Sequence, residues 1–151
     1  MYPIRYVTIG RPKLEACREL ESHYEGMLKA FCRLDHVEIP EGRSDPARQM
    51  KDEAARLRPL FEGRVPILLD AGGPARSSED FAKWLGKRMD RGESLVFAIG
   101  SSHGFDPALK AEVPERLSLS PMTFPHDLSR VLFLEQLYRA FAILKGKTYH
   151  K

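Results

Sequence analysis

Apolar runs that suit buried strands alternate along this chain with apolar stripes that suit helices. Strands are predicted at Ile4–Ile9, Val37–Ile39, Val65–Leu69, Leu95–Ile99 and Arg116–Leu119. Several of these runs are almost wholly apolar, which is typical of strands buried on both faces. Strands of this kind that are separated by helical segments form a parallel sheet. We therefore expect an α/β fold in which helices cover both faces of a parallel sheet.

Helical segments follow the strands, with apolar residues spaced three and four positions apart. The first helix is predicted over about Lys13–Arg33. The second begins at Asp45, an N-cap residue followed by Pro46, and Pro59 should end or kink it near Arg58. The alternation continues to the end of the chain without a linker or an internal repeat, so we expect one domain over residues 1–151.

The last predicted helix, Asp127–Leu144, is apolar on more than one side. One side carries Val131, Leu134, Tyr138, Phe141 and Ala142, and another carries Leu128, Leu132, Leu137, Ala140 and Leu144. A helix with two apolar stripes must bury both. The sheet covers one stripe, and a second subunit is the simplest cover for the other, so the pattern favours a homodimer. The alternative is a helix enclosed within its own domain.

The composition is that of an ordinary globular protein, with 42% hydrophobic and 30% charged residues. No run approaches the roughly 20 apolar residues of a membrane span, and the N-terminus has no signal-peptide pattern. Cys17 and Cys32 are interpreted as reduced thiols, and the sequence predicts a cytoplasmic protein with no membrane partner. The net charge of +3 permits a polyanionic partner without requiring one.

Two apolar runs in the last third of the chain end in small polar residues. Leu95–Ile99 is followed by Gly100–Gly104, and the segment Leu117–His126 leads directly into the last helix. A buried strand that ends in glycine or serine leaves its backbone N–H and C=O groups open to a ligand. Two such endings side by side would form the floor of a site that holds a small molecule through the main chain.

The usual nucleotide and metal signatures are absent from the sequence. The first predicted strand is followed by Thr8–Pro12 rather than by a glycine-rich dinucleotide fingerprint, and the chain has no P-loop. No group of histidines and cysteines has the spacing of a metal site. We therefore expect no metal, and any cofactor site must be built from other elements.

Residues Gly100–Gly104 also match the G-x-S-x-G pattern of serine hydrolases. In that interpretation Ser102 is the nucleophile, and Asp127 with His150 or His126 completes a catalytic triad. A helix should follow such a turn at once, whereas residues 105–107 interrupt it here. Serine hydrolysis is therefore the lesser alternative.

Basic and aromatic residues gather around and after the last helix. His126 and Arg130 lie one turn apart at its N-terminus, which suits an anionic or proton-losing substrate. Equally, His126 could join the helix cap and Arg130 could pair with Glu115 or Asp127. The tail Lys145–Lys151 carries basic residues and two rings, a combination that suits phosphates and base stacking.

Together, these segments resemble one family. Ile99-Gly100, Leu117–His126, the helical stretch Arg130–Ala140 and the closing Tyr149–Lys151 are similar, in this order, to the RlmH (YbeA) family, the ribosomal RNA large-subunit methyltransferases H of the SPOUT superfamily. The resemblance covers essentially the whole chain. It implies an α/β domain whose C-terminal part forms a trefoil knot, and a homodimer formed through the knotted region.

The resemblance also implies an activity. Members of the family transfer a methyl group from S-adenosylmethionine to N3 of a pseudouridine in 23S rRNA, on assembled ribosomes. The N3–H proton must leave, and the hypothesis is that His126 or His150 accepts it while Arg130 stabilises the resulting anion. The alternatives are methylation of another RNA and a ribosome-associated protein that binds without catalysis.

The matching positions give the expected site residues. Those beside the target base are His126, Arg130, Tyr149 and His150. Those that bind the cofactor are Leu69, Gly100, Leu119, Ser120, Pro121, Met122, Thr123 and Phe124. Two positions depart from the family pattern: Ser101 replaces a second glycine after the strand, and His103 stands where a small or acidic residue is common. Ser101 adds a side chain near the expected methionine end of the cofactor.

Overall fold

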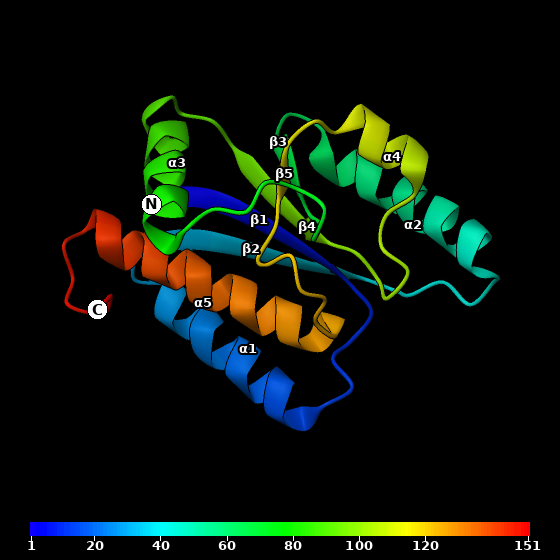
Figure 1. Cartoon of the computed structure of the whole chain (residues 1–151), viewed down its shortest axis with the longest axis horizontal. Coiled ribbons are helices and arrows are strands. Elements are labelled where there is room, and N and C mark those ends of the chain that lie inside the picture. The colour runs from blue at the N-terminus through cyan, green and yellow to red at the C-terminus, as the bar shows by residue number, and fades with distance from the viewer.

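Five parallel strands form one sheet in the spatial order β2-β1-β4-β3-β5 (Figure 1). A computed structural model describes residues 1–151 of the protein. The strands are β1 (Tyr2–Ile9), β2 (Cys32–Ile39), β3 (Val65–Leu69), β4 (Leu95–Ile99) and β5 (Arg116–Leu117). Every neighbouring pair is parallel, which confirms the predicted parallel sheet. The carboxyl ends of the strands therefore lie along the same edge.

Helices cover both faces of this sheet, as predicted (Figure 1). They are α1 (Glu15–Leu28), α2 (Pro46–Phe61), α3 (Ser78–Asp90), α4 (Pro107–Glu112) and α5 (His126–Leu144). One buried cluster joins α1, α3 and α5 to one face, and a second joins α2 and α4 to the other. None of the five helices combines the length and the apolar character that crossing a membrane requires. The trefoil knot stays a prediction from the family resemblance.

Some element boundaries differ from the sequence prediction. Helix α1 ends at Leu28, and β2 begins already at Cys32, which pairs with Tyr2 of β1. The full length of β2 is not evident from the sequence, because β2 lies at the sheet edge and its residues alternate irregularly between polar and apolar. Helix α2 runs through Pro59 to its end at Phe61, so of the two predicted effects of Pro59, an end or a kink near Arg58, the end is wrong. Pro59 is exposed in the last turn, where the loss of one backbone hydrogen bond is tolerated.

Arg130 on α5 is the bulkiest of the fully buried side chains, with 1% of its surface exposed. Its guanidinium donates to both carboxylate oxygens of Glu21 on α1 at 2.9 and 2.8 Å. It also donates to Glu38 of β2 at 2.9 Å and to the carbonyl of Gly10 at 2.8 Å. Burial disfavours the charged guanidinium, but the bonds to Glu21 and Glu38 outweigh it and raise the pKa of Arg130 above its usual value. Arg130 thus fastens the start of α5 to α1 and to the ends of β1 and β2.

Replacing Arg130 with methionine is expected to lower the free energy of unfolding by about 3–5 kcal/mol, because Glu21 would be left buried without its counter-charge. Arg139→Met is the matched control, since Arg139 pairs with Glu135 on the same helix with more of its side chain exposed, and it should cost less than about 1 kcal/mol. Urea denaturation at one fixed protein concentration measures both. Equal losses in the two variants would contradict the role assigned to Arg130.

Candidate functional site

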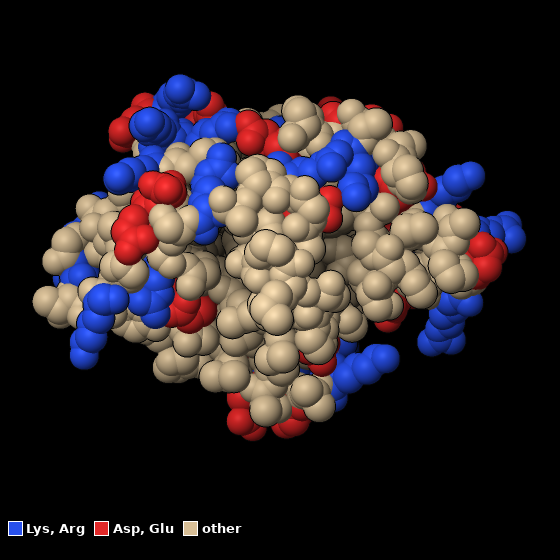
Figure 2. Space-filling view, viewed as in Figure 1, with Lys and Arg blue, Asp and Glu red and all other residues tan.

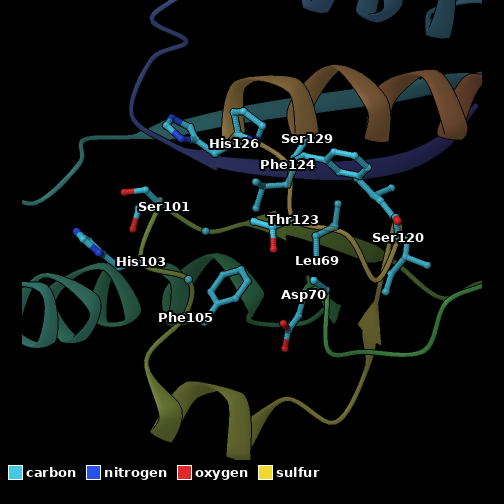
Figure 3. Close-up of a pocket in the computed structure, with 18 of the residues that line it drawn as sticks. Leu69, Asp70, Ser101, His103, Phe105, Ser120, Thr123, Phe124, His126 and Ser129 are labelled. Carbon is cyan, nitrogen blue, oxygen red and sulfur yellow. The ribbon is translucent and has the colours of Figure 1, made fainter.

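A cavity of about 880 Å³ opens at the carboxyl edge of β3, β4 and β5 (Figure 3). Three turns supply most of its wall: residues 69–71 after β3, 99–105 after β4 and 119–126 after β5. Ligands of parallel α/β sheets bind at this edge, and the volume is that of a small-molecule site. The two apolar runs that end in small polar residues are not neighbours in the sheet, since β3 lies between β4 and β5, but their endings line the same cavity.

The turn after β4 requires a glycine at its first position. A Cβ atom on Gly100 would lie 3.2 Å from the backbone carbon and oxygen of Gly104. The turn closes with a hydrogen bond from the N–H of Gly104 to the carbonyl of Ser101 at 2.9 Å. Gly104 itself has a φ of 80°, which favours glycine. The backbone of this turn is therefore packed tightly against itself and forms one wall of the cavity.

The hydroxyl of Ser101 is hydrogen-bonded inside the protein and is not free to contact a ligand in the cavity. Its Oγ donates to Glu53 of α2 at 2.9 Å, and both side chains are buried. Glu53 also accepts from the N–H of Gly42 at 3.3 Å and from Gln49 Nε2 at 3.2 Å. The serine that replaces the family's second glycine is thus held by a buried carboxylate on the helix behind the turn.

The loop after β5 is stiffened by its own serines. Ser118 Oγ lies within hydrogen-bond distance of the carbonyls of Ser120 and Ala71, at 2.9 and 3.2 Å. Ser120 Oγ accepts from the N–H of Met122 at 3.1 Å. These bonds hold the loop against the turn after β3, and so they fix the main-chain groups that face the cavity.

The two ends of the cavity differ in composition. In Figure 3, Ser101, His103 and His126 gather at one end, whereas the apolar side chains of Leu69 and Phe124 lie toward the other, together with Asp70 and Ser120. All the expected cofactor residues except Pro121 line the cavity: Leu69, Gly100, Leu119, Ser120, Met122, Thr123 and Phe124. A cavity of this kind suits an elongated ligand with an apolar ring at one end and a polar group at the other.

Asp70 is a cavity residue that the sequence reasoning missed. Its Oδ2 lies 3.1 Å from Lys110 Nζ and 3.8 Å from Arg116 Nη1, and its Oδ1 accepts from the N–H of Gly72. Burial raises the pKa of the Asp70 carboxyl. The hydrogen bond from the Gly72 N–H and the positive charges of Lys110 and Arg116 lower it by more, so the pKa lies below its usual value. The signal was available, because Asp70 directly follows the β3 strand at the carboxyl edge.

The four residues expected beside the target base do not meet in one chain. His126 lines the cavity, together with Lys13 and Ser129. Arg130 faces away from it, since its guanidinium is committed to Glu21 and Glu38. Because these carboxylates already occupy the guanidinium, the structure does not favour the direct contact with substrate that was expected of Arg130.

The tail residues Tyr149 and His150 come after α5 and fold back along it, because Tyr149 bonds to Glu135, the middle residue of this 19-residue helix. Tyr149 donates to Glu135 at 3.1 Å, and His150 Nε2 lies 2.6 Å from Glu79. Burial and the Glu135 carboxylate raise the pKa of Tyr149 to about 12. In a single chain, the tail is thus docked against α5 and α3, and neither Tyr149 nor His150 lines the cavity.

The geometry does not assemble a serine hydrolase. Ser102 is exposed, and its side chain makes no hydrogen bond with a histidine. Asp127 accepts from the N–H groups of Lys13 and Leu14 and lies 3.2 Å from His126 Nε2, but this acid–histidine pair has no hydrogen bond to Ser102. Residues 105–106 separate the turn from α4, a helix of only 6 residues. The match to the G-x-S-x-G pattern is therefore a coincidence of a serine- and glycine-rich turn.

Comparison with known proteins shows which family the chain belongs to. Residues 2–150 match the family model described as "Predicted SPOUT methyltransferase". The chain is 40% identical to a protein of Gloeobacter violaceus, with 97% of each covered, and 35% identical to one of Caldicellulosiruptor saccharolyticus, with 98% and 99% covered. Both relatives are named "Ribosomal RNA large subunit methyltransferase H".

The fold has a counterpart among solved structures. A probable methylase family protein from Haemophilus influenzae superposes with a TM-score of 0.55 over 98% of this chain and 70% of the other, at 12% identity. The likeness supports the fold, whereas the family assignment rests on the sequence matches over nearly the whole chain. On these matches, the chain belongs to the SPOUT methyltransferase family.

Proposed function

We propose that this protein transfers a methyl group from S-adenosylmethionine to N3 of a pseudouridine in the large-subunit ribosomal RNA, on assembled ribosomes. The observation that carries this proposal is the end-to-end similarity to relatives named "Ribosomal RNA large subunit methyltransferase H", which includes all three cavity turns. A substrate of this kind implies action in the cytoplasm.

The chemistry of the cavity fits S-adenosylmethionine. The tight wall at Gly100 offers backbone atoms where a side chain would intrude, and Leu69, Leu119 and Phe124 offer apolar surface for an adenine. The polar end, with Ser101 and His126, suits the methionine part. When bound, S-adenosylmethionine supplies a methyl group activated by its sulfonium, so the protein needs mainly to orient the base.

The remaining chemical task is to remove the N3–H proton of the target base. His126 lines the polar end of the cavity and is the residue that we assign to accept this proton, directly or through water. Two lysines line the cavity. Lys110 pairs with Asp70, whereas Lys13 lies in the segment held by Asp127 beside His126 and can stabilise the resulting anion. Arg130 contributes by holding the start of α5 in place rather than by touching the substrate.

The exposed leucines of α5 support a homodimer. Leu128, Leu132 and Leu144 are each about two-fifths exposed on this otherwise buried helix. A second copy of the chain would cover them. In such a dimer, Tyr149 and His150 of one chain can serve the partner's cavity, since neither of them lines the cavity of its own chain.

The surface suits a composite binding site better than general RNA binding. Basic and acidic side chains are intermixed in Figure 2, and the centre of that face, over the segment between β5 and α5, is uncharged. With a net charge of +3, the chain has little excess positive charge to offer the phosphate backbone. Recognition should therefore depend on the folded ribosome.

Whole ribosomes are expected to be methylated efficiently, and an isolated rRNA hairpin hardly at all. Incorporation of a labelled methyl group from S-adenosylmethionine, mapped to a nucleotide, measures both. Equal rates on the two substrates would contradict the composite site. A label mapped outside the large-subunit RNA would favour the alternative, a SPOUT methyltransferase that acts on another RNA.

Gly100→Ala is expected to weaken S-adenosylmethionine binding at least about tenfold, or about 1.4 kcal/mol. The added Cβ would press on the backbone of Gly104 and displace the cavity wall. Gly26→Ala is the control, because nothing lies within 4 Å of a Cβ there and an alanine favours the helix. Titration calorimetry measures the dissociation constants. Unchanged binding in Gly100→Ala would remove this turn from the cofactor site.

Mixing the two inactive variants His126→Ala and His150→Ala should restore activity. In a mixed dimer, one of the two cavities combines an intact His126 with an intact His150, so roughly a quarter of the wild-type rate should return. Each variant alone should lose about 10²-fold or more in single-turnover methyl transfer. A mixture that stays inactive would contradict the shared site, and full activity of either variant would remove that histidine from the reaction.

A further inference from the structure

A buried carboxylate lies next to His126, and the function proposed above does not use it. Asp127 is the second residue of α5, and 7% of its side chain is exposed. Its Oδ2 accepts the N–H groups of Lys13 and Leu14 at 2.7 and 3.1 Å, just before α1. Its Oδ1 is buried without a hydrogen-bond partner and lies 3.2 Å from His126 Nε2.

The unpartnered oxygen offers an acceptor to one ring nitrogen of His126. A buried carboxylate oxygen without a donor is costly, and the ring nitrogen that faces it can supply one. At 3.2 Å the nitrogen is within reach, and such contacts tighten when a substrate binds. The bond made by one nitrogen of an imidazole sets the state of the other. With the proton on Nε2, Nδ1 is left free.

We propose that Asp127 is a positioning residue that keeps the His126 proton on Nε2, so that Nδ1 can take the N3 proton of the target base. This inference rests on the proposed function. In the step, the N3–H bond breaks, its electron pair stays on N3, and Nδ1 binds the proton. The imidazolium that results is paired with the Asp127 carboxylate.

The same carboxylate also positions the other charged group at this end of the cavity. By holding the N–H groups of Lys13 and Leu14, Asp127 fixes the segment that brings Lys13 to the cavity. The further titratable groups around the cavity are His103 after β4, Asp70 after β3 and Lys110 on α4. Of all these groups, only Asp127 lies within ion-pair distance of the His126 ring.

The tautomer of His126 tests the contact without any activity measurement. In Asp127→Asn, the amide oxygen can still accept from Lys13 and Leu14, but the amide nitrogen then faces the ring and donates to it. The ring proton should therefore move from Nε2 in the wild type to Nδ1 in the variant. Nitrogen NMR of the histidine-labelled protein reports this, with the His126 signal identified by its loss in His126→Gln. The same tautomer in both proteins would overturn the proposal.

Kinetics test the consequence for the reaction. Asp127→Asn should reduce single-turnover methyl transfer to ribosomes at least about tenfold, as expected for a misplaced ring proton, while S-adenosylmethionine binding and thermal stability stay near wild type. The deficit should shrink at alkaline pH, where the imide of the base ionises without help. A deficit that is the same at every pH would mean a structural role only and would overturn the proposal.

Asp45→Asn is the matched control, because Asp45 also caps a helix through a backbone N–H, at 3.2 Å, but touches no histidine. It should change neither the rate nor the tautomer. If the wild type methylates no RNA, the proposed function fails, and the NMR comparison still decides whether Asp127 sets the state of His126.

Discussion

Three parallel strands that end at the same level create the cavity on which every functional feature depends. Leu69, the last residue of β3, pairs with Ile99, the last of β4, and with Leu117, the last of β5. Parallel pairing forces the three following turns to leave the sheet at one edge. β5 has only two residues, and after Leu117 the chain continues along this edge as the loop that leads into α5. The register of the sheet thus brings three distant segments together as one wall.

Buried charges then hold the elements around this wall. Arg130 joins α5 to α1 and to the ends of β1 and β2, and Glu53 joins α2 to the turn after β4. Asp127 joins the start of α5 to the start of α1. Charged groups are costly in the interior, and they are retained where each one finds several partners. In this protein all of them lie just behind or beside the cavity, where the position of the backbone matters most.

Much of the fold and the cavity could be predicted because their signals are local. The apolar runs of β3 and β4, and the small residues that follow β4, are contiguous in the sequence. The commitment of Arg130 could not be predicted, because its partners Glu21 and Glu38 are 109 and 92 residues away. The same holds for the tail: a basic, aromatic pattern says nothing of the Glu79 and Glu135 carboxylates against which His150 and Tyr149 dock.

The hydrogen bond between Ser101 and Glu53 couples the chemical requirements of these two positions. A glycine at position 101 would leave the carboxylate with two donors instead of three, and an apolar residue at position 53 would release the hydroxyl toward the ligand. Neither replacement is neutral by itself. A helix on the outer layer therefore limits which residues the inner wall can accept, and drift in one is constrained by the other.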